Sequence, residues 1–100
     1  PPAALEDGSV YLLASGQLMR IAHNSLLWTL ELPCEWNRPR MSVLADTSVL
    51  VAAGQTLLHV SADGTVLKQM FFEDTLTCRP VTDEQGRVYV GGSLKLYCVK

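Results

Sequence analysis

Few residues of this chain have the types and the spacing that catalysis or metal binding would need. His23 and His59 stand alone, without the further ligands at fixed spacing that a metal centre requires. The carboxylate pairs Glu73-Asp74 and Asp83-Glu84 could act as general acid and base, but only in a cleft that separates their pKa values. Both pairs fall in predicted turns, so we expect solvated surface groups there.

Motifs for phosphate, dinucleotide and serine-hydrolase chemistry are missing from the sequence. We therefore predict no catalytic, cofactor-binding or metal-binding residues and no cofactor, and the sequence favours a protein that is not an enzyme. The formal net charge of −2, with 8 scattered Lys and Arg residues, argues against a nucleic-acid partner. The sequence has no run of about 18 apolar residues, so we expect no insertion into a membrane.

The three cysteines, Cys34, Cys78 and Cys98, are too few and too irregularly spaced to form a disulfide framework. One Cys78–Cys98 bond is an alternative, but we expect partly buried thiols that pack as small apolar side chains. Neither asparagine begins an N-x-S/T glycosylation site. The sequence leaves the compartment unknown; these features favour the cytoplasm, with the periplasm or an organelle lumen as alternatives.

The segment 34–40 is the best candidate for a contact with another protein. It carries Trp36, Arg38 and Arg40 in a predicted loop, and Trp and Arg are enriched among the residues that dominate interface energies. The alternative is structural, with Trp36 covering a neighbouring repeat beside a hinge proline, Pro39.

An internal repeat of 39 residues sets the elements that must position these side chains. It appears in two series of apolar residues, which are Val10, Val49 and Val88, and Ile21, Val60 and Val99. A period near 40 residues that is built from short strands is typical of propeller blades.

Each repeat is expected to hold up to four strands and no helix, because short apolar runs alternate with turn residues. We expect the strands at 39–44 and 80–82, at 9–14, 48–53 and 87–91, at 17–21, 56–60 and 94–99, and at 26–32 and 65–72. Residues 1–5 could supply part of another first strand. The second strand of each repeat is apolar on both faces, which predicts burial on both sides.

Two sets of equivalent positions predict local structure. Turns precede the second strands at Asp7-Gly8, Asp46-Thr47 and Gln85-Gly86. Thr47 replaces a glycine that tolerates positive φ, so its turn is expected to be strained or of a different type. The equivalent residues Arg20, His59 and Cys98 are chemically unrelated, which predicts a semi-exposed position rather than a catalytic one.

These strands and turns resemble the repeats of pyrroloquinoline-quinone-type (PQQ-like) β-propellers. The resemblance is carried by the Pro-led strands, by Gly86-Arg87-Val88-Tyr89-Val90-Gly91-Gly92 with Leu96-Tyr97, and by Asn24-Ser25-Leu26-Leu27-Trp28. It covers residues 5–100, with departures at Thr47 and at Lys68, where the family pattern has Trp. Such repeats specify the fold well and the function poorly.

We predict an all-β fold of four-stranded antiparallel blades, about two and a half of them, as an incomplete propeller. The expected parts are a partial first blade at 1–37, a central blade at 38–78 and a partial third blade at 79–100. WD40-like blades are the structural alternative. An immunoglobulin-like sandwich is disfavoured, because Trp36 lies only two residues after Cys34 and the repeat would go unexplained.

For function we predict a non-catalytic scaffold for protein interactions within a larger protein or complex. Its expected partners are other propeller blades, in the same longer chain or in other subunits, and further proteins. Open blade faces would expose an apolar surface that a monomer rarely tolerates, so we expect a segment that other blades complete. The alternatives are a fragment of a quinone-dependent oxidoreductase and a ligand-sensing module.

Overall fold

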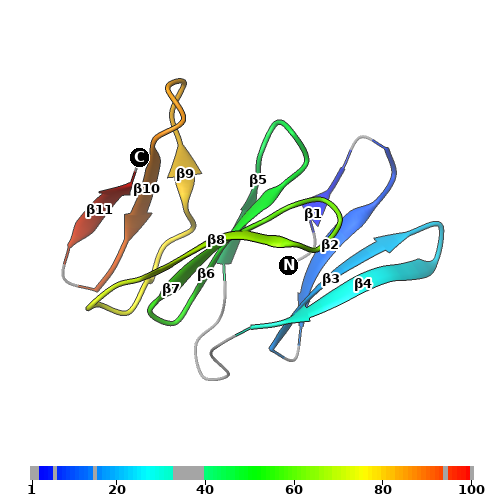
Figure 1. The fold of residues 1–100 in the computed structure, drawn as a ribbon, viewed down its shortest axis with the longest axis horizontal. Coiled ribbons are helices and arrows are strands. Elements are labelled where there is room, and N and C mark those ends of the chain that lie inside the picture. The colour runs from blue at the N-terminus through cyan, green and yellow to red at the C-terminus, as the bar shows by residue number, and fades with distance from the viewer. Residues whose placement is uncertain (1–2, 6, 15, 33–39, 94, 100) are drawn as a thin grey trace.

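The computed structural model is an all-β fold, and no helix occurs in the residues that it describes, which are 3–5, 7–14, 16–32, 40–93 and 95–99. In this described part, 11 strands form three antiparallel sheets, which lie side by side in chain order along the longest dimension (Figure 1). The protein measures 40 × 32 × 21 Å. The same residues include no helix able to cross a membrane. The prediction of an all-β chain of antiparallel strands is confirmed.

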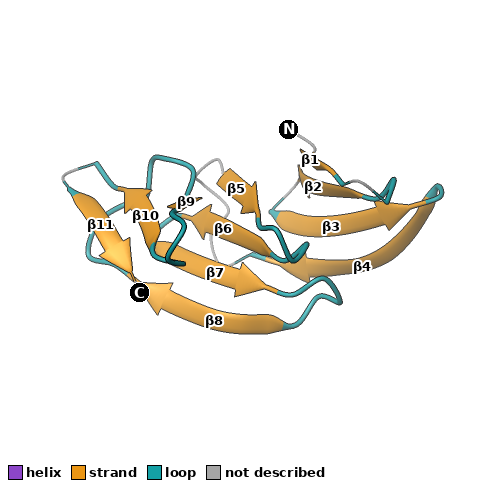
Figure 2. Ribbon diagram, turned by 90° about the horizontal axis from the view of Figure 1, so that it is seen from above, coloured by secondary structure: helices purple, strands orange, loops and turns teal. Residues whose placement is uncertain are grey.

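The three sheets repeat one simple strand order. The first sheet consists of β1 (Ala3–Ala4), β2 (Val10–Ala14), β3 (Gln17–Ala22) and β4 (Ser25–Glu31). The second consists of β5 (Arg40–Val43), β6 (Val49–Ala53), β7 (Thr56–Val60) and β8 (Val66–Phe71). The third consists of β9 (Val81–Thr82), β10 (Val88–Gly91) and β11 (Leu96–Val99). The edge strands β1, β5 and β9 lie on one side of the row of sheets, and β4 and β8 lie on the opposite side (Figure 2).

The 39-residue repeat of the sequence is a repeat of strand register. The two apolar series pair with each other in each sheet, as Val10 with Ile21, Val49 with Val60, and Val88 with Val99. Within the segment 1–5, Ala3–Ala4 form the expected strand, because Ala3 of β1 pairs with Tyr11 of β2. The alignment that the sequence predicts therefore holds residue by residue between the central strands.

One turn conformation closes four of the hairpins. In the first sheet the Gly8 amide donates to the Leu5 carbonyl at 3.1 Å, and the Leu5 amide donates to the Ser9 carbonyl at 2.8 Å. The same two bonds recur in the turns that begin at Leu44, Ser61 and Asp83. The fourth residue of each turn has a positive φ, as in a type I turn followed by a left-handed residue: Gly8, Thr47, Gly64 and Gly86.

Thr47 keeps this common turn, with φ at 69°, and does not form a turn of another type. Of the two alternatives left by the sequence, strain is therefore the correct one. A left-handed backbone brings Cβ too close to the neighbouring carbonyl oxygen, and a β-branched side chain adds to that crowding.

The second sheet packs on both of its faces. One face forms a cluster with the first sheet: Tyr11, Leu18, Leu32, Met41, Val49, Val51, Ala53, Leu58 and Val60. The other face contributes to a cluster with the third sheet and the loop before it: Ala52, Leu57, Leu76 and Val90. Every residue of β6 is buried, as its two apolar faces predicted. Most residues of β2 and β10 stay half-buried, because their sheets have a described neighbour on one side only.

The expected exposure is wrong at Asp74 and at two of the cysteines. Asp74 was predicted in a solvated turn, but it is 5% exposed and accepts a hydrogen bond of 2.5 Å from the Ser93 hydroxyl. It packs so closely on Gly92 that a Cβ there would overlap the Asp74 carboxylate. Cys78 and Cys98 are exposed free thiols, neither partly buried nor joined to each other. Cys34 lies outside the described residues.

We expect Thr47→Gly to raise the free energy of unfolding by about 0.5–1 kcal/mol. Strain at a left-handed residue costs about 1–3 kcal/mol, and the greater freedom of glycine in the unfolded chain offsets part of the gain. Gly86→Thr is the matched control, because its φ is 80° and an added Cβ would meet nothing within 4 Å. That variant should lose a similar amount. Urea denaturation measures both, and a Thr47→Gly protein no more stable than wild type would contradict strain at this turn.

Candidate functional site

A layer of three large side chains joins the first sheet to the second. Tyr11 pairs with Arg20 across β2 and β3, and Arg20 pairs with Trp28 across β3 and β4, so the three side chains lie next to one another. The guanidinium carbon of Arg20 is 5.4 Å from the centre of the Tyr11 ring, and the Tyr11 and Trp28 ring centres are 6.0 Å apart. These distances are within the range of cation–π and aromatic contacts.

Carbonyl groups in two turns of the second sheet anchor this layer. The Tyr11 hydroxyl donates to the Thr47 carbonyl at 2.5 Å. Arg20 Nη1 and the Trp28 indole nitrogen both donate to the Ala62 carbonyl, at 2.6 and 2.9 Å. Each of the three side chains thus donates at least one hydrogen bond across the interface, whereas Arg20 Nε is buried without a partner among the described residues.

Arg20 is a buried cation, 8% exposed, and not the semi-exposed residue that the sequence predicted. Its Nη2 lies 3.2 Å from the Ser9 hydroxyl and 3.4 Å from the Asp7 carboxylate. Ser9 in turn donates to Asp7 at 2.6 Å. Hydrogen bonds from the Ser9 side chain and amide, with a smaller contribution from the Arg20 charge, lower the pKa of Asp7 below its ordinary value of 3.8.

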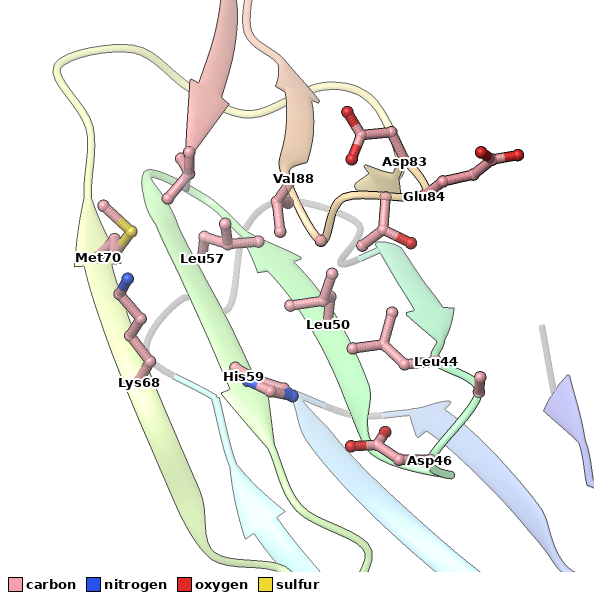
Figure 3. Close-up of a pocket in the computed structure, with 14 residues that line it drawn as sticks. Leu44, Asp46, Leu50, Leu57, His59, Lys68, Met70, Asp83, Glu84 and Val88 are labelled. Carbon is pink, nitrogen blue, oxygen red and sulfur yellow. The ribbon is translucent and has the colours of Figure 1, made fainter.

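The equivalent positions of the second sheet carry smaller or more exposed side chains. Strand register places Leu50, His59 and Lys68 where the first sheet has Tyr11, Arg20 and Trp28. A cavity of about 520 Å³ lies there, between the second and third sheets (Figure 3). We call it the inter-sheet cleft. Its volume is within the range of about 300–1,000 Å³ that is usual for ligand sites.

The inter-sheet cleft has an apolar interior and a charged rim. Its apolar lining includes Leu50, Leu57, Met70, Val88 and Val99. Figure 3 shows three carboxylates on the side of the β5–β6 and β9–β10 turns, and one ammonium group across from them on β8: Asp46, Asp83, Glu84 and Lys68. An apolar group with a cationic end would match this arrangement in both shape and charge.

Asp83 is already engaged on the third sheet. It accepts a hydrogen bond of 2.7 Å from Arg87 Nε and one of 3.1 Å from the Tyr89 hydroxyl. Partial desolvation raises the pKa of Asp83, but these bonds and those from the Arg87 and Gln85 amides lower it more, so it lies below 3.8. Asp83 therefore stays ionised at neutral pH and keeps the rim acidic.

A serine, a histidine and an aspartate meet at one end of the cleft without forming a catalytic triad. Ser48 Oγ is 2.9 Å from His59 Nε2 and 2.5 Å from Asp46 Oδ1. In a serine hydrolase the histidine takes the serine proton and the aspartate binds the histidine. Here the aspartate accepts a hydrogen bond from the serine itself, and Ser48 is 3% exposed. The arrangement therefore lacks the order of a triad, and its hydrogen bonds join Ser48 to the turn.

The first sheet indicates which histidine nitrogen carries a proton. Arg20 occupies the position equivalent to His59. It has no acceptor atom, so it donates to Ser9, and the Ser9 hydroxyl donates a hydrogen bond to Asp7. Because the Ser48 hydrogen is directed to Asp46, the 2.9 Å contact of His59 Nε2 with Ser48 Oγ is a hydrogen bond only in the tautomer that has a hydrogen on Nε2. Neither set of residues builds a metal centre, since no three His, Cys, Asp or Glu side chains in the described ranges gather around a common point.

The predicted interface segment is only partly visible. Trp36 and Arg38 lie outside the described residues, so their role stays a prediction. Arg40 is the exposed first residue of β5, opposite Ala52 in strand register. It does not line the inter-sheet cleft.

Sequence reasoning missed the cleft, although a signal was present. Lys68 was noted as a departure from the repeat, but its consequence becomes visible only together with Leu50. Leu50 and Lys68 stand where the first sheet has the aromatic rings of Tyr11 and Trp28. The second interface therefore lacks the groups that fill the first one.

No known protein family and no curated protein matches this sequence. Among solved structures, the chain is similar to a protein of unknown function from Bacteroides caccae, with a TM-score of 0.71 and 23% sequence identity. The match covers 91% of this chain and 37% of the other. This chain thus spans little more than a third of the length of its structural neighbour, and the likeness at this identity supports the fold alone.

We expect Asp46→Asn to destabilise the protein more at pH 7 than at pH 3. Hydrogen bonds from the Ser48 side chain and amide hold the pKa of Asp46 below 3.8, so its ionised form stabilises the folded state above about pH 4. That contribution disappears as the pH falls through the lowered pKa, and the difference between wild type and variant should shrink. Urea denaturation at both pH values measures the effect.

The control for this experiment is Glu84→Gln, which changes an exposed carboxylate that accepts no hydrogen bond within the described ranges. It should change stability little at either pH. An equal loss at pH 7 and pH 3 for Asp46→Asn would contradict a role for its charge.

Proposed function

We propose that this chain is part of a β-propeller of the PQQ-like type and acts as a non-catalytic scaffold for protein interactions. The observation that carries the proposal is the way in which neighbouring sheets meet. Tyr11 and Leu18 of the first sheet pack in one cluster with Val49 and Val60 on the facing side of the second sheet. The two faces of one sheet are therefore different, and each fits the opposite face of its neighbour.

The two ends of the row carry these same faces without a described neighbour. The outer face of the first sheet has the equivalents of the valine-rich face: Val10, Leu12, Met19 and Ile21. The outer face of the third sheet has the equivalents of the tyrosine-bearing face: Val81, Tyr89, Leu96 and Cys98. Val81 is 57% exposed and Leu96 is 73% exposed. Such unlike and complementary ends favour head-to-tail addition of further sheets, which closes into a ring when the rotation allows it.

In this proposal the repeat supplies a rigid frame and the loops supply the contacts. Turns with repeated geometry hold each sheet. The proposed contact residues for a partner are Trp36 and Arg38, which precede the second sheet in the sequence, and Arg40, which begins it. Ser48, His59 and Asp46 are the side chains that most resemble a catalytic group. The hydrogen bond from Ser48 to Asp46 supports a structural role for them.

We expect chain 1–100 to associate in solution through its end faces. Sedimentation equilibrium should give a mass that rises with concentration, and Leu12→Lys should reduce it by placing a charge on the valine-rich end face. Leu67→Lys is the matched control, because Leu67 is 56% exposed on β8 and lies on neither end sheet. A monodisperse monomer with a cooperative melt at all concentrations would refute the proposal.

A further inference from the structure

The two interfaces between sheets share one backbone plan but differ in what fills them. In the first, Tyr11 is 0% exposed, and its hydroxyl meets the Thr47 carbonyl of the next sheet. In the second, the same place belongs to Leu50, which is shorter and has no hydroxyl. Gly86 is the residue equivalent to Thr47, and it lines the inter-sheet cleft. Leu50 therefore donates no bond of this kind to the Gly86 carbonyl.

The wall across the cleft matches the wall on which the first layer rests. Val49 and Val60 support that layer from the second sheet and are 0% exposed. Their equivalents in the third sheet, Val88 and Val99, pair in the same register but are only half-buried. The third sheet thus offers the apolar surface that an aromatic layer covers in the first interface.

A carboxylate is also in place for a cation. In the first sheet Asp7 uses one oxygen for Ser9 and turns the other toward Arg20. Asp46 uses Oδ1 for Ser48 in the same way, and no described residue donates to its Oδ2. The facing turn adds acidity, because Asp83 and Glu84 stand where the preceding repeat has Leu44 and Ala45.

We propose that the inter-sheet cleft binds a peptide segment of a protein partner through an aromatic side chain next to an arginine or lysine. The aromatic ring takes the place that Tyr11 has in the first interface, between Leu50 and Val88, with a donor directed to the Gly86 carbonyl. The neighbouring cation lies beside Asp46, next to His59, which holds the position equivalent to Arg20. The chain's own first interface thus serves as the template for its ligand.

A peptide fits the cleft better than a purely apolar or acidic ligand. The cavity of about 520 Å³ accommodates one large side chain and part of its neighbour, and its interior is mostly aliphatic. Its rim carries three carboxylates, of which Asp83 is paired with Arg87, and one ammonium group, Lys68, and this balance favours a basic segment over an acidic one. Aromatic residues and arginine are also the side chains that most often anchor protein interfaces.

The test is a titration of the full-length protein, labelled at Leu and Val methyl groups, with the blocked dipeptide acetyl-Arg-Tyr-amide. We expect NMR shifts at the methyl groups of Leu50, Leu57 and Val88. Acetyl-Glu-Tyr-amide and acetyl-Arg-Leu-amide are the matched probes and should bind about 10-fold more weakly, each through loss of one of the two contacts. Equal shifts with all three dipeptides, or no shifts at these methyl groups, would overturn the proposal.

Two variants fill the cleft with the residues of the first interface. Leu50→Tyr should weaken binding of acetyl-Arg-Tyr-amide about 10-fold or more and raise the melting temperature, because the new ring occupies the site. Lys68→Trp changes a residue of the mostly exposed strand β8 and should also weaken binding of the dipeptide and raise the melting temperature. This second variant still tests the site if Leu50→Tyr does not fold. Leu67→Tyr is the control outside the cleft and should bind as wild type does. Unchanged binding in a folded Leu50→Tyr or Lys68→Trp protein would contradict the site.

This inference rests on the proposed scaffold role, since it names the chemistry of a partner. The proposed assembly and the proposed peptide site can be rejected independently of each other. Association through the end faces is measured by mass with Leu12→Lys, whereas the cleft is measured by methyl shifts with Leu50→Tyr. Normal association without peptide shifts would reject the cleft alone, and peptide shifts in a strict monomer would reject the assembly alone.

Discussion

The burial of β6 on both faces is the constraint on which the rest of the structure depends. Its five residues, 49–53, alternate between the cluster shared with the first sheet and the side facing the third, and all are at most 3% exposed. Full burial of one valine or leucine stabilises the folded state by about 1.5–3 kcal/mol. If one face of the sheet were solvated, about half of these residues would lose that contribution. The second sheet is therefore stable only as a middle layer, and the unlike faces of its two neighbours follow from that position.

The turns do more than connect strands, because they also carry the polar bonds between sheets. A serine or threonine next to the left-handed residue binds the preceding aspartate, as Ser9, Ser48 and Thr65 do, and this fixes the direction of the turn carbonyls. Those carbonyls are the acceptors for Tyr11, Arg20 and Trp28. Strain at Thr47 persists because its carbonyl is held by the Tyr11 hydroxyl in a buried bond, which the surrounding packing enforces.

The sequence predicted the strands, their pairing and the both-sided burial of β6, since all of these follow from apolar spacing and turn residues. It could not predict that Arg20 is buried, because that depends on carbonyls of a turn 42 residues away. The same reason applies to Asp74, which is covered through contacts with Gly92 and Ser93 from another hairpin. The cleft could not be predicted from the sequence, because it arises from the difference between two equivalent interfaces. A single position such as Lys68 does not reveal that difference.

The comparison of the two interfaces also indicates where function can arise in a repeated structure. The backbone of each repeat is fixed by the turn bonds and by the pairing of the valine series, so side chains on the tyrosine-bearing face can change without loss of the sheet. Where that face carries Tyr11, Arg20 and Trp28, these side chains fill the interface and each donates to a turn carbonyl of the second sheet. Where it carries Leu50, His59 and Lys68, the same frame leaves a cavity that is lined by two half-buried valines and has three carboxylates at its rim. A fold that stacks sheets can therefore acquire a binding site by loss of large side chains at one interface, while its neighbour keeps the stack together.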